Sequence, residues 1–191
     1  MISLICMLEE PSAKEMLQVV LPKILPDNVS ILYMVFEGKQ DLEKRLEGRM
    51  RGWRTPNTCF LVMRDQDSGD CVSIKNGLVE KVMRSGKADR TIIRIACREL
   101  ESFYLGDLKA VEQGLNLNNI SKQQTRAKYL SPDEISRPSE ELYKLTNNVY
   151  QKVQGSRLIA PHLNLDGSNA SSSFNILISG IKKLITVSGP Y

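Results

Sequence analysis

Four short apolar segments recur along the first part of the chain. They span residues 2–8 (ISLICML), 29–36 (VSILYMVF), 58–63 (TCFLVM) and 91–97 (TIIRIAC). Each segment has the length of a strand, and each is an almost continuous apolar run, which is typical of a strand that is covered on both faces of a sheet. The pattern therefore predicts four buried strands.

Helical periodicity fills the stretches between these strands. After the first strand, apolar residues at positions 13, 16, 17, 20 and 21 would line one face of a helix, and Pro11 and Ser12 suit the start of that helix. Comparable apolar faces follow the second strand (Leu42, Leu46 and Met50) and the third (Ile74, Leu78, Val79 and Val82). Strands that alternate with amphipathic helices predict an α/β fold with a parallel sheet of about four strands, flanked by helices.

The pattern changes at about residue 110. Beyond it the chain is more polar, is interrupted at Pro132, Pro138 and Pro161, and has a Ser/Asn/Gly-rich stretch at 167–173 before an apolar helical segment near 174–185. We therefore expect an α/β core over 1–110 and a helical C-terminal extension over 111–191 that packs on this core.

Carboxylates follow three of the predicted strands. Glu9 comes after the first, and Asp65 and Asp67 come after the third. Because the carboxyl ends of parallel strands meet at one edge of the sheet, these three side chains are expected to converge. On an extended chain, residues two apart point to the same side, so Asp65 and Asp67 would face one ion. Mg²⁺ or Mn²⁺ suits such oxygen ligands, although any single acid after a strand can instead serve a turn or a helix cap.

The fourth strand leads to Glu99 and Glu101. If a helix begins there early, their side chains point about 200° apart, so that only one faces the site. We expect Glu101 to face it, supporting a second cation or positioning the attacking water, and Glu99 to lie near free amides at the helix start. A surface acid or an ion pair with a nearby arginine is the alternative for Glu101.

The charge balance is mildly basic. The formal net charge is +4, with 25% charged and 41% hydrophobic residues, which fits a packed core and is compatible with a polyanionic partner. Arg49, Arg51 and Arg54 lie beside Trp53, a combination that could bind phosphates and stack on a base. Glu43 and Glu47 are interspersed, which favours the alternative of a solvated helix face with Trp53 against the core.

Several function classes lack their motifs. The sequence has no GxxxxGK[ST] and no GxGxxG, so neither P-loop ATP hydrolysis nor Rossmann-type dinucleotide binding is indicated. The four cysteines form no CxxC pair, and no nucleophile-elbow motif accompanies the single histidine, His162. Without a signal-peptide pattern or an apolar run of membrane-spanning length, we expect a cytoplasmic location and no membrane contact.

A resemblance extends these expectations. The stretches LEEPSAKEML and RDQDSGDC resemble the Toprim domain shared by topoisomerases, primases and the overcoming-lysogenization-defect nucleases. Over its length the chain resembles a bacterial family, a domain of unknown function with a Toprim-like, Rossmann-like fold, through FEGKQDLEKRL, VMRDQDSGDC, RELESFYLGD and RLIAPHLNLDGSNASSSF. Members are often encoded beside an ABC- or AAA-type ATPase, in arrangements that look like antiphage defence.

This resemblance implies roles for particular residues. Glu9 would be the Toprim glutamate, Asp65 and Asp67 the paired aspartates, and Glu99, Glu101 and Asp107 an acidic run after the fourth strand. It implies a Mg²⁺- or Mn²⁺-dependent nuclease acting on DNA or RNA under the control of an ATPase partner, with Glu9 as a metal ligand or as the general base.

The alternative to this nuclease is a non-catalytic subunit that regulates assembly with the ATPase, and self-association is left open. The chain departs from the pattern at two positions. It has Glu10 where a glycine is usual and Ala13 where members often carry an acid.

Overall fold

The four predicted strands form one parallel sheet. The computed structural model describes residues 2–188, in which β1 (Ile2–Leu8), β2 (Val29–Val35), β3 (Thr58–Asp65) and β4 (Thr91–Ala96) pair in the order β2-β1-β3-β4. All three pairings are parallel, and in the last of them Asp65 is the register partner of Ala96. The α/β prediction is thus confirmed, with a sheet of the Rossmann-like kind.

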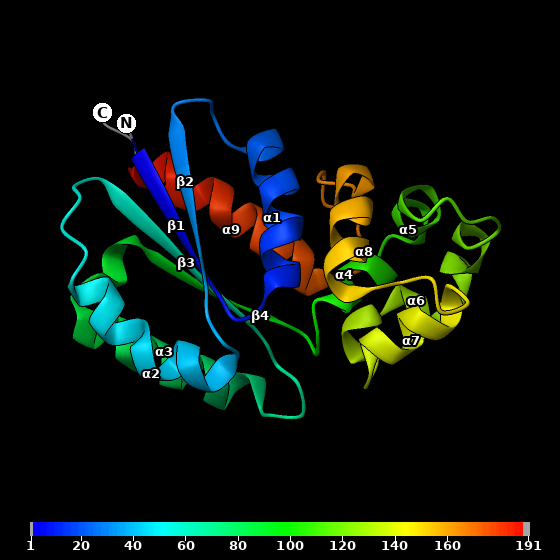
Figure 1. The fold of residues 1–191 in the computed structure, drawn as a ribbon, viewed down its shortest axis with the longest axis horizontal. Helices are drawn as coiled ribbons and strands as arrows, with labels where there is room; N and C mark the ends of the chain where they lie inside the picture. Colours follow the sequence, from blue (N-terminus) through cyan, green and yellow to red (C-terminus); the bar gives the residue numbers. More distant parts are fainter. Residues whose placement is uncertain (1, 189–191) are drawn as a thin grey trace.

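Helices cover both faces of the sheet (Figure 1). α1 (Pro11–Ile24) and α9 (Ser172–Ser188) lie on one face, and α2 (Lys39–Arg51) and α3 (Cys71–Ser85) lie on the other. The residues spaced for helical faces are the ones that are buried, such as Met16 and Leu17 in α1 and Leu42 and Leu46 in α2. Periodicity of 3.6 residues therefore determined which side of each helix meets the sheet.

A group of shorter helices lies beside the sheet, at the end where β4 leads into α4 (Figure 1). It comprises α4 (Glu101–Leu105), α5 (Leu108–Gly114), α6 (Ala127–Leu130), α7 (Pro138–Leu145) and α8 (Lys152–Ile159), with short 3-10 segments between some of them. Within this group α4 packs on α7, whereas α8 packs on α1, which covers one face of the sheet. The chain then returns to the sheet, because α9 packs on β3 and β4.

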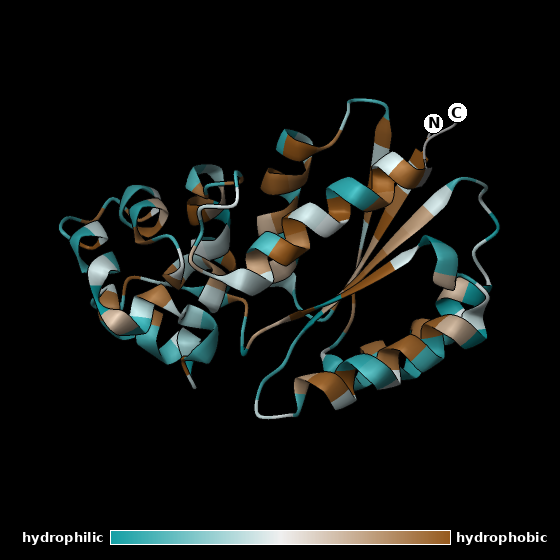
Figure 2. Cartoon of the chain, turned by 180° about the vertical axis from the view of Figure 1, so that it is seen from behind, coloured by the Kyte–Doolittle hydropathy of each residue, from teal (hydrophilic) through white to brown (hydrophobic). Residues whose placement is uncertain are grey.

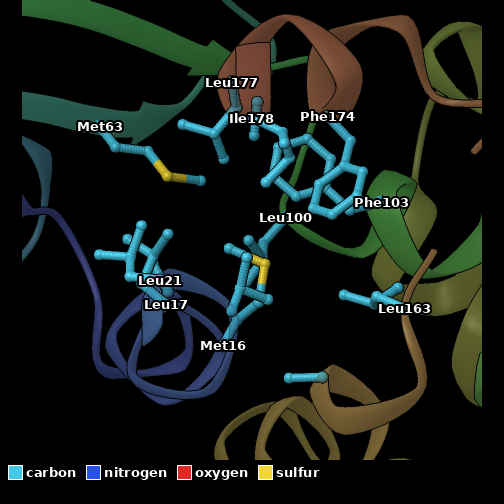
Figure 3. Packing of buried hydrophobic residues seen from close by; sticks show 14 of the residues in the cluster. Met16, Leu17, Leu21, Met63, Leu100, Phe103, Leu163, Phe174, Leu177 and Ile178 are labelled. Carbon is cyan, nitrogen blue, oxygen red and sulfur yellow. The ribbon is translucent and has the colours of Figure 1, made fainter. Parts of the chain in front are cut away.

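Apolar side chains join this group to the sheet. Figure 2 shows hydrophobic residues concentrated in the strands and on the inward sides of the helices. In Figure 3, side chains from α1 and α9 face one another, with Met63 of β3 on one side and Leu100 and Phe103 on the other. Phe103 and Phe174 stack at a tilt, with ring centroids 5.2 Å apart. The segment that leads from β4 into α4 is thereby fixed by the main core.

Two further features bear on the sequence predictions. Cys6 and Cys59 are buried and Cys71 and Cys97 are half-buried, all four as free thiols. Across residues 2–188, the structure has no helix whose length and apolar character would let it cross a membrane.

Candidate active site at the carboxyl end of the sheet

Two of the predicted acids meet at the point where the strand order of the sheet reverses. From β1 the chain passes outward to β2 and then returns past β1 to β3 and β4, so the switch in strand order falls between β1 and β3. At such a point the loops after the two strands part, and ligands bind there in open parallel sheets. Glu9 directly follows β1 and Asp65 ends β3, and the Asp65 backbone N–H donates to Glu9 Oε2 at 3.0 Å. The structure thus brings Glu9 and Asp65 together at this point.

Asp65 lies among other carboxylates. It is only 6% exposed, and burial, followed by the charges of Glu10, Glu101 and Glu9, raises its pKa well above the usual value. Burial likewise raises the pKa of Glu9, although the Asp65 N–H and the Arg64 charge oppose that rise. We call Glu9, Glu10, Asp65 and Glu101 the acidic cluster.

Glu101 is the most deeply placed member of the cluster. It begins α4 and is fully buried, with an exposed fraction of 0%. Its Oε1 accepts a hydrogen bond of 2.9 Å from the Tyr150 hydroxyl and lies 3.9 Å from Lys152 Nζ. Among the described residues its Oε2 has no hydrogen-bond partner. Burial raises the pKa of Glu101, while Lys152 lowers it. A buried carboxylate oxygen without a partner is costly.

Asp67 is oriented differently from Asp65. The extended chain ends at Asp65, and Asp67 has a left-handed backbone with φ of 54°. Its N–H donates to the Arg98 carbonyl at 2.8 Å, and its carboxylate accepts from Lys39 Nζ at 2.7 Å. The prediction that Asp65 and Asp67 share one side of an extended chain is therefore wrong, because the loop turns after β3, as aspartate readily allows.

A buried arginine sits between these acids. The Arg64 side chain is 4% exposed, and its Nε donates to the Asp65 carbonyl at 2.8 Å. Its guanidinium lies 3.7 Å from both Glu9 Oε2 and Asp67 Oδ2, and a third contact is an ion pair with Glu43. Arg64 is therefore a fixed cation that holds Glu9 and Asp67 on either side of it.

The other acids after β4 have structural roles. Glu99 Oε2 accepts from the Ser139 N–H at 2.7 Å, at the start of α7. Glu99 thus accepts from a free amide at a helix start, as expected. The helix, however, is α7 and not α4, which follows Glu99 in the chain. Asp107 caps α5 through the Ala110 N–H at 3.1 Å and also accepts from the Asn164 N–H at 2.9 Å.

The candidate nucleic-acid contacts lie at the opposite end of the sheet. Arg49 and Arg51 are in the last turn of α2, and Arg54 precedes β3. Since α2 has 13 residues, it carries them about 20 Å from the carboxyl ends of the strands. Arg51 is paired with Glu47, and Trp53 packs edge-on against Phe60 with ring centroids 6.2 Å apart. This set therefore lies apart from the acidic cluster.

Sequence reasoning missed four residues of the site. Glu10 was visible only as a departure from a glycine, whereas Tyr150 and Lys152 come from the distant α8 region and have no local signal. Arg64 did have a signal, because it is a charged residue inside a strand whose every position is buried.

The residue types of the acidic cluster suit a hard cation. Their present arrangement does not. The ligands would be carboxylate oxygens, which Mg²⁺ and Mn²⁺ prefer, and Glu101 Oε2 is without a partner. Yet within residues 2–188 no three His, Cys, Asp or Glu side chains are grouped so that they could hold a metal ion. Glu9 is engaged by the Asp65 N–H, and Glu101 by Tyr150. A cation would bind only if these side chains exchanged partners.

Fold and site together define an α/β protein with a Rossmann-like parallel sheet and an acidic cluster at its switch point. A family model, that of the domain of unknown function DUF4276, matches residues 8–182. The chain therefore belongs to this family, and the matched range includes every member of the acidic cluster as well as Lys152. The chain matches no curated protein and no solved structure.

Proposed function

We propose that this protein is a Mg²⁺- or Mn²⁺-dependent phosphodiesterase that cleaves DNA or RNA, with the acidic cluster as its active site. One observation carries the proposal: Asp65 is buried at the switch point of a parallel sheet, its N–H donates to Glu9, and the charges of Glu10, Glu101 and Glu9 all help to raise its pKa. Carboxylates whose charges act on one another disfavour one another's ionisation, and such arrangements concentrate at functional sites. A divalent cation would remove that repulsion.

Asp65, Glu9 and Glu101 are the residues that would hold the ion, with Glu10 adding charge. Bound Mg²⁺ would supply a Lewis acid and a water of lowered pKa. The protein itself contributes positioning: Arg64 and the Asp65 N–H orient Glu9, and Tyr150 orients Glu101. Glu9, whose pKa is raised by burial, is also suited to accept a proton from an attacking water.

Cations beside the cluster favour a phosphate substrate. Lys39 and Lys152 are both 47% exposed and flank the acids from α2 and α8. Lysine binds phosphate as a point charge, so the pair would hold the backbone on either side of the scissile bond. The net charge of +4 adds weak, sequence-independent attraction to a nucleic acid.

The direct test is cleavage of plasmid DNA and of single-stranded RNA by the purified chain with Mg²⁺ or Mn²⁺. We expect Asp65→Asn to reduce cleavage at least about 1,000-fold, because it removes the central ligand. Asp27→Asn is the matched control, since Asp27 is exposed in the turn before β2. Cleavage that persists in Asp65→Asn, or in excess EDTA, would rule out this active site.

A second candidate is a non-catalytic subunit that uses the cluster for regulated assembly. It is favoured by the fact that Arg64, Lys39 and Lys152 already pair with the acids. Metal binding separates the two functions: thermal unfolding in millimolar Mn²⁺ should raise the Tm of the wild type and not of Asp65→Asn if the ion site exists. Equal shifts in both would mean that Mn²⁺ binds elsewhere, which would count against the nuclease and leave the assembly role.

The proposal includes an ABC- or AAA-type ATPase partner. The chain has no nucleotide-binding motif of its own, so energy-dependent control would have to come from another protein. Co-expression with an ABC- or AAA-type ATPase from the same gene neighbourhood, if one is encoded there, should increase cleavage in the presence of ATP. Full turnover by the chain alone, unchanged by the ATPase, would contradict this part of the proposal.

A further inference from the structure

Two half-buried thiols lie together at the carboxyl end of the sheet. Cys71 is the first residue of α3, and Cys97 directly follows β4. Burial raises the pKa of the Cys97 thiol to about 11, and the charge of Cys71 and a contact with its thiol add to that rise. The other two cysteines, Cys6 and Cys59, are fully buried in β1 and β3. Cys71 and Cys97 are therefore a pair of thiols that are close to each other and also partly exposed.

The backbone brings this pair together. After β3 the chain runs beside the end of β4, where the N–H groups of Gln66 and Asp67 donate to the carbonyls of the residues before and after Cys97, at 3.0 and 2.8 Å. The loop then folds back on itself, because the Gln66 side chain donates to the Gly69 carbonyl at 2.9 Å. α3 begins two residues later, at Cys71, and packs on β4. The proximity of the two thiols is thus fixed by main-chain hydrogen bonds and by helix packing.

The two thiols have different surroundings. Cys71 stands at the start of a helix of 15 residues, and the free amides at a helix N-terminus stabilise a thiolate. Cys97 keeps its proton at neutral pH, since its pKa is raised, and its S–H donates to the Ile95 carbonyl at 3.9 Å. In such a pair one sulfur can attack an oxidant, and the neighbouring thiol can then resolve the product.

We propose that Cys71 and Cys97 form a reversible disulfide when the protein meets hydrogen peroxide. The Cys71 thiolate attacks one peroxide oxygen, the O–O bond breaks, and the hydroxide that leaves takes up a proton to become water. The Cys97 sulfur then attacks the resulting Cys71 sulfenic acid, so that the S–S bond forms and a second water leaves with the Cys97 proton. The two thiols lose two electrons in total, and the peroxide is reduced to two waters.

The disulfide would join the start of α3 to the end of β4. It would hold the loop 66–70, which leads from β3 to α3 and carries Asp67, against the neighbouring strand end. The inference goes beyond the proposed function and does not depend on it, because the bond can be measured without any activity.

The experiment is peroxide treatment of the folded full chain, then blocking of the remaining thiols, trypsin digestion without reductant and mass spectrometry. We expect peptide 65–75 to be linked to peptide 95–98, and the link to disappear in dithiothreitol. Cys6 and Cys59 are the internal controls, since both are buried and should be recovered reduced. A folded chain that links other cysteines, or none in millimolar peroxide, would overturn the proposal.

Two variants test the order of the steps. In Cys97→Ser the Cys71 sulfenic acid has no resolving thiol, so dimedone, which labels sulfenic acids, should label Cys71 after peroxide treatment. In Cys71→Ser the protonated Cys97 thiol should remain unlabelled. Labelling of Cys97 in Cys71→Ser that matches the labelling of Cys71 in Cys97→Ser would overturn the assignment of Cys71 as the attacking thiol.

Thermal unfolding tests whether the bond fits the folded protein. A crosslink between residues 71 and 97 restricts the unfolded chain, so oxidation should raise the Tm by about 5–10 °C, and dithiothreitol should reverse the rise. Cys71→Ser treated with peroxide in the same way is the control and should show no such shift. A linked protein whose Tm is unchanged or lowered would contradict the proposal, because the bond would then distort the fold.

Discussion

The two ends of the sheet differ in how their charged side chains are placed. At the carboxyl end, Glu9, Asp65 and Glu101 are contributed by three separate chain segments and are mostly buried. At the amino end, Arg49 and Arg54 come from one helix end and the loop after it, and they are exposed. The carboxyl end gathers groups from many elements because each strand there leads into a helix start. Burial and convergence, more than the number of charges, distinguish the candidate active site.

Glu101→Gln tests the carboxyl end most severely. The amide keeps the shape and can still accept the Tyr150 hydrogen bond, but it removes a charge from the cluster. We expect the fold to persist and cleavage to fall about 100-fold, as for the loss of one strong catalytic contact. Glu99→Gln is the matched control, since Glu99 binds the Ser139 N–H, and it should leave cleavage almost unchanged. Equal losses of cleavage in Glu101→Gln and Glu99→Gln would mean that Glu101 contributes to the stability of the protein and not to catalysis.

Gly155→Ala tests whether the α8 region holds the cluster in place. A Cβ at Gly155 would come within 2.4 Å of the Tyr150 ring, so the ring, whose hydroxyl donates to Glu101, must shift. Overpacking of this kind costs about 1–3 kcal/mol, more than the gain in helix propensity. Urea unfolding should show that loss. The control is Gly77→Ala, because a Cβ at Gly77 in α3 meets nothing within 4 Å. A stable Gly155→Ala protein with unchanged activity would show that Tyr150 is dispensable.

The pH dependence of stability should differ between the wild type and Asp65→Asn. The pKa of Asp65 is raised in the folded protein, so the folded state binds more protons than the unfolded state between the unfolded and folded pKa values. In EDTA this residue makes the free energy of unfolding fall as the pH rises through that window, and the loss persists above the folded pKa.

Asp65→Asn should remove this part of the pH dependence and be more stable than the wild type at pH 8, with the gap closing towards pH 4. Urea unfolding at several pH values measures it. Opposing effects of acids with lowered pKa, such as Asp70 and Glu47, are the same in both proteins and cancel in the comparison. A difference in the free energy of unfolding that does not change with pH would show that burial does not raise the pKa of Asp65.

The smallest effect is expected at the amino end. Arg49→Ala/Arg54→Ala leaves the Arg51–Glu47 ion pair intact and should change stability by less than about 0.5 kcal/mol. Because these arginines are far from the cluster, cleavage should change by less than about threefold. The check is DNA affinity against salt concentration. A drop in the salt slope by about two would instead assign both residues to phosphate contacts.

The short-range patterns were sufficient for the frame of the molecule. Four apolar runs became four parallel strands, and positions such as Leu42 and Leu46 became the buried face of α2. The proximity of Glu9 and Asp65 also followed, because acids after neighbouring parallel strands must share an edge. These features depend on periods of a few residues and on one rule of sheet topology, so the sequence determined them.

The partners of the site were decided only by the tertiary structure. Asp67 turns towards Lys39 because the loop after β3 pairs with Arg98, and Glu99 serves α7 because that helix packs on α4. Tyr150 and Lys152 reach Glu101 because α8 docks on α1, where Arg157 and Glu15 pair at 2.7 Å across 142 residues of sequence. No local pattern specifies such a meeting, since it depends on how whole elements bury their apolar faces against one another.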